Sequence, residues 1–139
     1  MADGESPIYL AARVVKAGRA AGEALVSSEN IGFLGGVDPE TGVVIEVGHP
    51  LEGQSVSGRV LVFATGKGST VGSYTIYRLA RAGLAPAAIV NADADPVVAV
   101  GAIIAEIPMV DQVDISRICT GDWVEVHGQE IIVWQQAGL

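Results

Sequence analysis

The sequence has one cysteine, Cys119, and two histidines, His49 and His127, among its 139 residues. A single cysteine cannot form an intrachain disulfide, which agrees with a reducing compartment. An iron–sulfur cluster is held by several thiolates, four in the commonest sites, so this chain alone cannot hold one. The two histidines are far apart and belong to no CxxC or HExxH spacing, so they support no zinc site. No metal or cofactor is expected on this chain.

Basic residues and long apolar runs are also scarce. The chain has 8 Lys and Arg against 16 Asp and Glu, a formal net charge of -8. This balance argues against nucleic acid as a ligand, because a phosphate backbone is bound through clustered cations. The longest apolar stretches, such as residues 97–105, are far shorter than the ~20 residues that cross a bilayer. We expect a cytoplasmic protein that binds neither nucleic acid nor a membrane.

The chain length indicates one domain. Half of the residues are apolar, and 139 residues lie within the usual size of a single domain. Asp3 and Glu5 stand where a secretory signal would carry basic residues, so residues 1–10 are interpreted as a loose leader. Residues 11–139 are expected to form the domain.

Hydrophobic periodicity predicts an α/β fold class. Apolar runs predict strands at residues 11–15, 22–27, 43–47, 58–64, 86–90 and 108–110. A helical stripe begins at Val71 and stops at Gly83, and Asp95-Pro96 is typical of the cap and first turn of a second helix that ends near Ala105. Alternating runs at residues 123–126 and 130–134 predict a hairpin. The order is a β-rich start, an α/β middle and a closing hairpin.

The most informative segment is Gly66-Lys67-Gly68-Ser69-Thr70-Val71-Gly72, between a predicted buried strand and a predicted helix. Backbone N–H groups converge on an anion at such a place. The segment is not a Walker A loop, because Gly68 follows Lys67 where Ser or Thr is required. It is not a dinucleotide fingerprint either, since Val71 stands where the third glycine belongs. Two interpretations stay open, an ordinary helix N-cap and a catalytic Ser69.

A catalytic Ser69 has to lose its proton near neutral pH. Each unit by which its pKa falls requires about 1.36 kcal/mol of preferential stabilisation of the alkoxide, and a helix dipole supplies at most ~2 kcal/mol. Neighbouring N–H donors and a cation such as Lys67 must therefore contribute as well. No histidine neighbours Ser69, so a Ser-His-Asp nucleophile fits poorly.

Several ordered motifs resemble the small, or swivel, subunits of the aconitase X family. They comprise residues 35–42 (GGVDPETG), 48–51 (GHPL), 66–74 (GKGSTVGSY) and 101–108 (GAIIAEIP), and the match runs from about Ala11 to Gln135. The resemblance implies a swivelling β/β/α fold, like the mobile fourth domain of aconitase. It also implies a partner, a large subunit that carries an iron–sulfur cluster or an iron ion.

The chemistry that the resemblance implies is water loss by a hydro-lyase. In that family a serine of the glycine loop takes a proton from the substrate while the metal on the large subunit binds the departing hydroxyl, and Ser69 is the matching residue. The aconitase loop reads Gly-Ser-Ser-Arg, and its arginine helps to bind substrate carboxylate, whereas Thr70 and Val71 follow Ser69 here. Four loop residues are expected to bind a small anionic substrate instead: Gly66, Lys67, Gly68 and Thr70.

Two activities are attached to such subunits. One is dehydration of (R)-5-phosphomevalonate to trans-anhydromevalonate 5-phosphate in the archaeal mevalonate route to isoprenoids, and the other is dehydration of cis-3-hydroxy-L-proline. We expect the former, because a free-standing small subunit suits it best. A non-catalytic module that binds an anion or a partner protein is the competing class.

Several residues outside the loop are given structural interpretations. His49 precedes a proline in a predicted turn and is expected to be structural rather than catalytic. Cys119, beside Ile118, is expected to be a small buried hydrophobe. Arg78 and Arg81, near the end of the first helix, form either a solvated helix face or a contact for an acidic surface of the partner.

Overall fold

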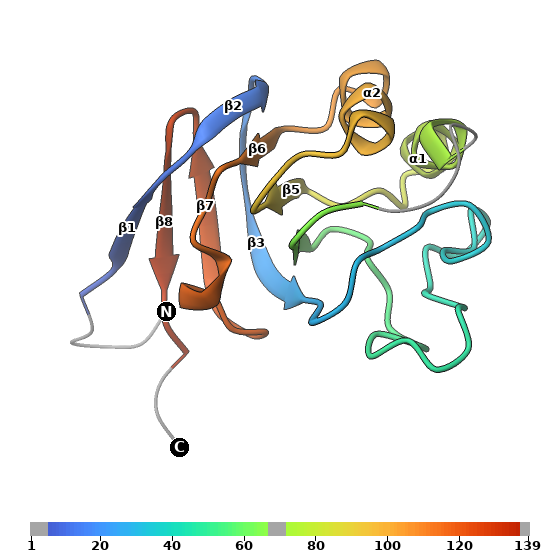
Figure 1. The fold of residues 1–139 in the computed structure, drawn as a ribbon, viewed down its shortest axis with the longest axis horizontal. Helices are drawn as coiled ribbons and strands as arrows, with labels where there is room; N and C mark the ends of the chain where they lie inside the picture. Colours follow the sequence, from blue (N-terminus) through green and yellow to red (C-terminus); the bar gives the residue numbers. More distant parts are fainter. Residues whose placement is uncertain (1–5, 67–71, 137–139) are drawn as a thin grey trace.

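The computed structural model describes residues 6–66 and 72–136 (Figure 1). Its elements are β1 (Ile8–Ala11), β2 (Arg13–Lys16), β3 (Arg19–Val26), β4 (Val60–Phe63), α1 (Gly72–Arg81), β5 (Ala88–Asn91), α2 (Pro96–Ala105), β6 (Met109–Asp111), the 3-10 helix η1 (Ile115–Arg117), β7 (Trp123–His127) and β8 (Glu130–Trp134). The predicted α/β class is confirmed, with a β-rich start, a β-α-β-α-β middle and a closing hairpin.

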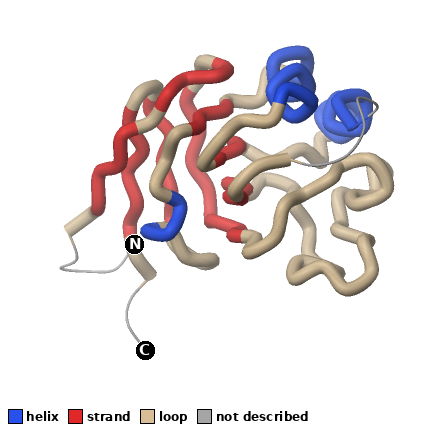
Figure 2. Tube along the Cα trace, viewed as in Figure 1, coloured by secondary structure: helices blue, strands red, loops and turns tan. Residues whose placement is uncertain are grey.

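One curved sheet organises the chain (Figure 2). The strand order is β1-β8-β7-β3-β4-β5-β6-β2, in which β3, β4, β5 and β6 are parallel and the remaining pairs are antiparallel. β1 and β2 stand at opposite ends of this order, yet only Ala12 separates them in the chain. The two edges of the sheet must therefore come together at Ala12, whose N–H donates to the carbonyl of Gln129 at 2.8 Å.

β4 shows how the strands divide their side chains between two cores. Val60 and Val62 pack with apolar side chains of β7 and β8 on one face of the sheet. Leu61 and Phe63 pack on the other face with side chains of α1 and α2. All four residues are fully buried. The continuous apolar run of this segment follows from its being covered on both faces.

α1 and α2 lie together on one side of the sheet (Figure 1). α1 ends at Arg81, and Gly83 then takes a φ of +74°, which turns the chain as the sequence predicts. α2 begins as predicted, because the Asp95 carboxylate accepts the N–H groups of Val97 and Val98 at 3.0 and 3.1 Å. Neither helix that the structure describes has the length and apolar character of a membrane span.

The strand predicted at residues 43–47 is wrong. Val44 forms one isolated bridge with Val37, and Val43 forms another with Ser55. A strand needs a neighbour that offers consecutive backbone groups, and these two partners belong to different turns. The apolar run serves the core instead, where Val44 is buried.

Two further predictions need correction. The leader predicted at residues 1–10 extends too far, because Ile8–Ala11 form β1 and pair with β8. The strand predicted at residues 11–15 is accordingly divided at Ala12 between β1 and β2. Cys119 is exposed rather than buried, since its neighbour Ile118 takes the position in the core.

Candidate active site

The predicted site lies on the connection between β4 and α1. Four of its five residues fall outside the described residues, and their roles stay predictions: Lys67, Gly68, Ser69 and Thr70. The fifth, Gly66, is described, and so is Gly72 at the start of α1. These two glycines show what surrounds both ends of the connection.

Gly66 approaches the first turn of α2 so closely that no side chain fits. A Cβ atom at this position would lie 2.5 Å from Cγ2 of Val98 and 3.0 Å from Oδ2 of Asp95. Gly66 also forms a parallel bridge with Ile31. A glycine is therefore required for the chain to leave β4 at this distance from α2.

The far end of the connection meets the same turn of α2. A Cβ atom at Gly72 would lie 3.3 Å from Cγ1 of Val97. The hydroxyl of Ser73 donates to the carbonyl of Val97 at 2.5 Å. Residues 95–98 thus contact both ends of the predicted site, and they hold Gly66 and α1 in a fixed relation.

The two helix N-termini beside the site differ in charge. The amino end of α2 is occupied by the Asp95 carboxylate, which accepts two of its free N–H groups. α1 has no acidic residue in its first turn. Because the first N–H groups of a helix carry partial positive charge, the amino end of α1 favours an anion beside it. This asymmetry suits a small anionic substrate on the α1 side.

The carboxyl ends of β4 and β5 are joined next to the predicted site. The carbonyl of Ala64, just after β4, accepts the N–H groups of Ala92 and Asp93, just after β5, at 3.1 and 3.0 Å. Ligands of α/β proteins bind outside the carboxyl ends of parallel strands. The topology therefore points to the same end of the sheet as the glycine loop.

Asn91 closes β5 with a polar side chain that the sequence analysis missed. The residue is completely buried, and its Nδ2 donates to the carbonyl of Phe63 at 2.9 Å. Within residues 6–66 and 72–136 its Oδ1 accepts no hydrogen bond. A buried acceptor without a donor is costly. A donor placed near the end of β4 would therefore gain a favourable hydrogen bond to this oxygen. The only signal in the sequence is one polar residue closing an apolar run.

The hydrogen bonds of His49 fix the orientation of its ring. Nδ1 of His49 accepts the N–H of Leu51 at 3.0 Å, so the ring proton is on Nε2, which lies 3.2 Å from the carbonyl of Asn30. This geometry agrees with the structural role expected for the buried His49. The part of the chain that is described contains no group of three or more His, Cys, Asp or Glu placed to hold a metal ion.

Comparison with known proteins identifies the family. The family model of the aconitase X swivel domain matches residues 9–134. The chain belongs to the aconitase X swivel domain family. The resemblance seen in the sequence is thereby confirmed, and the matched range includes the whole glycine loop.

Relatives and a solved structure extend the match over most of this swivel domain. A protein of Methanosarcina acetivorans named phosphomevalonate dehydratase small subunit is 53% identical over 127 residues, 89% of this chain and 88% of the relative. A protein of the same name from Methanocella arvoryzae is 58% identical over 119 residues, 84% of this chain and 90% of the relative. The crystal structure of Thermococcus kodakaraensis aconitase X in its holo form is 48% identical, with a TM-score of 0.90 over 92% of this chain and 99% of that chain. The swivel fold predicted from the sequence is confirmed.

Proposed function

We propose that this swivel domain is the small subunit of a hydro-lyase that converts (R)-5-phosphomevalonate to trans-anhydromevalonate 5-phosphate. The observation that carries the proposal is its identity of 53% and 58% to two proteins named phosphomevalonate dehydratase small subunit, over 89% and 84% of the chain. Relatives this similar along nearly the whole chain support the same activity here. The assembly is expected to act in the cytoplasm.

The proposal includes a large subunit, because a protein named a small subunit has a larger partner. An iron–sulfur cluster does not fit the residues of this chain. Such a cluster needs several thiolates, and the sequence has Cys119 alone, which is exposed. We therefore place the expected cluster or iron ion on the large subunit. The only step that we assign to the small subunit is removal of the C–H proton of the substrate.

Ser69 is the proposed base. Dehydration breaks a C–H bond and the C–OH bond of the neighbouring carbon, forms a C=C bond and releases the hydroxyl as water. Ser69, as its alkoxide, would take the proton of the C–H bond and become a neutral hydroxyl. The departing hydroxide gains one proton to leave as water, and loss of the proton from Ser69 balances this gain and restores the alkoxide. The start of α1, three residues later, supports this role, because its first turn carries no carboxylate to oppose an anion.

The helix dipole alone cannot create the alkoxide, since it contributes at most about 2 kcal/mol. We propose that loop N–H groups and Lys67 supply the remaining stabilisation. The same groups are proposed to bind the substrate anion, because no arginine follows Ser69 in the loop. The close packing of Gly66 and Gly72 on α2 supports this role, since it fixes both ends of the connection that bears Ser69.

The direct test is water loss by the reconstituted pair. The small subunit is co-expressed anaerobically with its large subunit and assayed with (R)-5-phosphomevalonate, beside each subunit alone and with cis-3-hydroxy-L-proline as the competing substrate. We expect activity only from the pair and only with phosphomevalonate. If the pair dehydrates cis-3-hydroxy-L-proline but not phosphomevalonate, the substrate must be reassigned. Turnover by the small subunit without its partner would contradict an active site built from both subunits.

A further inference from the structure

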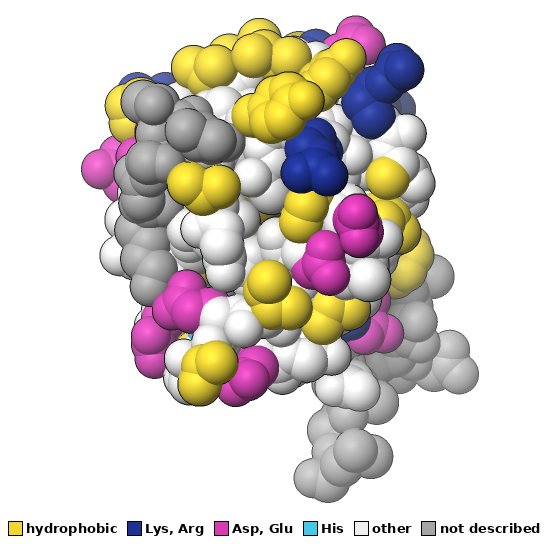
Figure 3. Space-filling model, turned by 90° about the vertical axis from the view of Figure 1, so that its right-hand side faces the viewer, with side chains coloured by type: hydrophobic (Ala, Val, Ile, Leu, Met, Phe, Trp, Pro, Cys, Tyr) yellow, Lys and Arg dark blue, Asp and Glu magenta, His cyan; other side chains and the backbone are white. Residues whose placement is uncertain are grey.

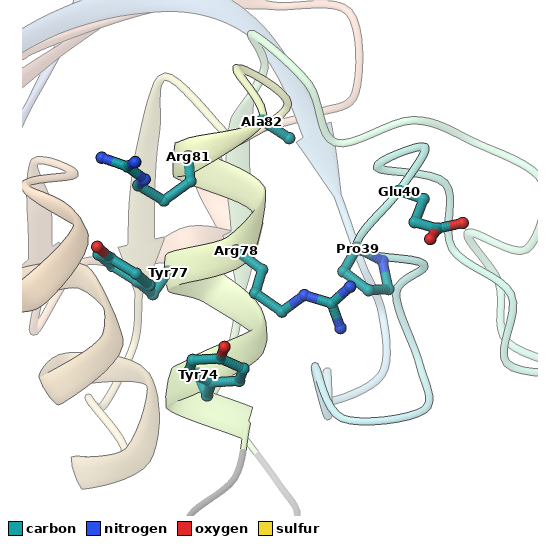
Figure 4. Close-up of a pocket in the computed structure, with 7 residues that line it drawn as sticks. All are labelled: Pro39, Glu40, Tyr74, Tyr77, Arg78, Arg81 and Ala82. Atoms are coloured by element: carbon teal, nitrogen blue, oxygen red, sulfur yellow. The ribbon is translucent and has the colours of Figure 1, made fainter.

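The outer face of α1 carries an open groove of about 590 Å³ (Figure 4). Six residues that line this α1 groove are Tyr74, Tyr77, Arg78 and Arg81 of α1, with Pro39 and Glu40 of the connection between β3 and β4. Figure 4 shows the guanidinium of Arg78 pointing toward Pro39, while the side chains of Tyr77 and Arg81 extend on the opposite side of the helix. The groove thus spans the exposed width of α1.

The α1 groove brings two arginines together on an acidic chain, with Glu40 on its opposite wall. Arg78 and Arg81 are two of only 8 basic residues in a chain of net charge -8. Both are exposed, and neither guanidinium forms an ion pair or hydrogen bond with any residue that the structure describes. Arg13 and Arg59, by contrast, are paired with Asp111 and Glu23. The helix dipole favours cations at this end, and both guanidinium groups face solvent, where a partner's carboxylates can reach them.

Apolar surface accompanies this charge. Tyr74 is 61% exposed, and its ring stacks on that of Tyr77 with centroids 6.4 Å apart. α2, which packs beside α1, exposes the aliphatic side chains of Val100, Ile103 and Ile104. Figure 3 shows Lys and Arg side chains next to hydrophobic ones on this side of the molecule, with Asp and Glu side chains close by. Exposed tyrosine and arginine beside apolar side chains are typical of the centre of a protein–protein interface.

We infer that the α1 groove receives an acidic segment of the large subunit. Carboxylates of that segment pair with Arg78 and Arg81, and its apolar atoms cover the stacked rings of Tyr74 and Tyr77. The inference rests on the proposed function only in requiring a large subunit. It identifies the surface and the charge that the partner must supply.

The shape of the groove favours a protein segment over the phosphate of a small substrate. From Tyr74 to Arg81 the helix rises about 10 Å, at 1.5 Å per residue, which accommodates about three residues of an extended chain. Small-molecule sites enclose most of their ligand, whereas the α1 groove is largely open to solvent. A partner held there would also fix α1, whose first residue, Gly72, adjoins the predicted site.

The test is the affinity of the purified subunits for each other, measured by isothermal titration calorimetry without substrate at about 50 mM and about 500 mM salt. The variant is Arg78→Glu with Arg81→Glu. The matched control, Arg19→Glu with Arg117→Glu, makes the same charge change at two exposed arginines outside the groove. We expect at least about 10-fold weaker binding at low salt for the groove variant, and a change within about 3-fold for the control.

A second variant separates lost attraction from new repulsion. Arg78→Gln with Arg81→Gln should weaken binding less than the glutamate pair and should reduce its salt dependence, because only the attraction is removed. Far-UV circular dichroism and the melting temperature of each isolated variant establish that it is folded. The inference would be overturned if the groove variants bound the large subunit as tightly as the control does and showed the same salt dependence as wild type.

Two other outcomes are separated by the same design. Unchanged association with a raised KM for phosphomevalonate would assign the arginines to the substrate phosphate, and the inference would be wrong. A pair that assembles through the groove but does not dehydrate phosphomevalonate would contradict the proposed function and leave the docking surface standing.

Discussion

The guanidinium of Arg13 on β2 donates two hydrogen bonds to the carboxylate of Asp111 on β6. Nε donates to Oδ1 at 2.8 Å, and Nη2 donates to Oδ2 at 2.7 Å. Asp111 is fully buried, and its Oδ2 also accepts the N–H of Ala94 at 2.9 Å. The hydrogen bonds from Arg13, together with the Ala94 N–H, hold the pKa of Asp111 below its ordinary value, although burial acts in the opposite direction. One carboxylate thereby joins an edge strand, its neighbour and the segment that enters α2.

This ion pair predicts a loss of stability in acid. The folded pKa of Asp111 lies below the unfolded one, so its stabilising effect is complete above the unfolded pKa, near 4, and is lost as the pH falls toward the folded value. At pH 7 we expect Asp111→Asn to lower the free energy of unfolding by about 1–3 kcal/mol. Denaturant unfolding at pH 7 and at about pH 3.5 should show a smaller acid loss for Asp111→Asn than for wild type.

The exposed Glu29 provides the control for that measurement. Glu29→Gln removes a carboxylate that contacts neither Arg13 nor Asp111. It should lose stability in acid as wild type does. If the free energy of unfolding fell equally in acid for wild type and Asp111→Asn, the loss of stability in acid would arise from groups other than Asp111.

The cap of α2 gives a second prediction. Asp95 accepts the N–H groups of Val97 and Val98, so Asp95→Ala should lower the free energy of unfolding by about 0.5–2 kcal/mol. Asp95→Ser keeps a capping oxygen and should recover most of that loss. Urea unfolding followed by circular dichroism measures both, and equal losses for the two variants would rule out the cap as the cause.

The contact between the two helices gives a third prediction. A Cβ atom at Gly101 would lie 2.7 Å from Cδ1 of Ile76 and 3.2 Å from Cα of Ser73. Gly101→Ala gains about 1 kcal/mol of helix propensity, but overpacking costs about 1–3 kcal/mol, and we expect net destabilisation. Ile76→Val removes the nearest atom, so the double variant should be more stable than the sum of the single changes by about 0.5 kcal/mol or more. Strict additivity in thermal or urea unfolding would contradict the close contact.

Local signals in the sequence predicted the helices well. Asp95-Pro96 predicts the start of α2 because a cap depends on neighbouring residues alone, and Gly83 predicts the end of α1 for the same reason. The alternating hairpin runs likewise became β7 and β8. Each of these features is decided within a few residues of the chain.

Features that depend on residues distant in the chain could not be predicted from the sequence. Val43 and Val44 have the composition of a strand, yet each forms only one isolated bridge, with Ser55 and Val37 respectively. The pairing of β1 with β8 and of β2 with β6 joins segments about a hundred residues apart, and periodicity carries no such information. The buried Oδ1 of Asn91 was missed because nothing in the sequence separates it from an ordinary strand end.

The site was predicted by the family resemblance rather than by local physics. Residue chemistry favoured an N-cap role for Ser69, whereas the ordered motifs matched it to a catalytic serine of the aconitase X family. The structure adds the surroundings of Gly66 and Gly72, which pack on the first turn of α2. These contacts involve backbone approaches that composition cannot reveal.

The central claim is that Ser69 acts as the base of a two-subunit dehydratase, and its most direct test is the turnover of (R)-5-phosphomevalonate by the assembled pair carrying Ser69→Ala. The control is Ser28→Ala, the same change at an exposed serine that lies outside the connection between β4 and α1. We predict that Ser69→Ala lowers kcat at least about 100-fold with subunit affinity unchanged, while Ser28→Ala retains most of the activity. Unchanged kcat in Ser69→Ala would contradict the claim and limit the loop to binding or positioning.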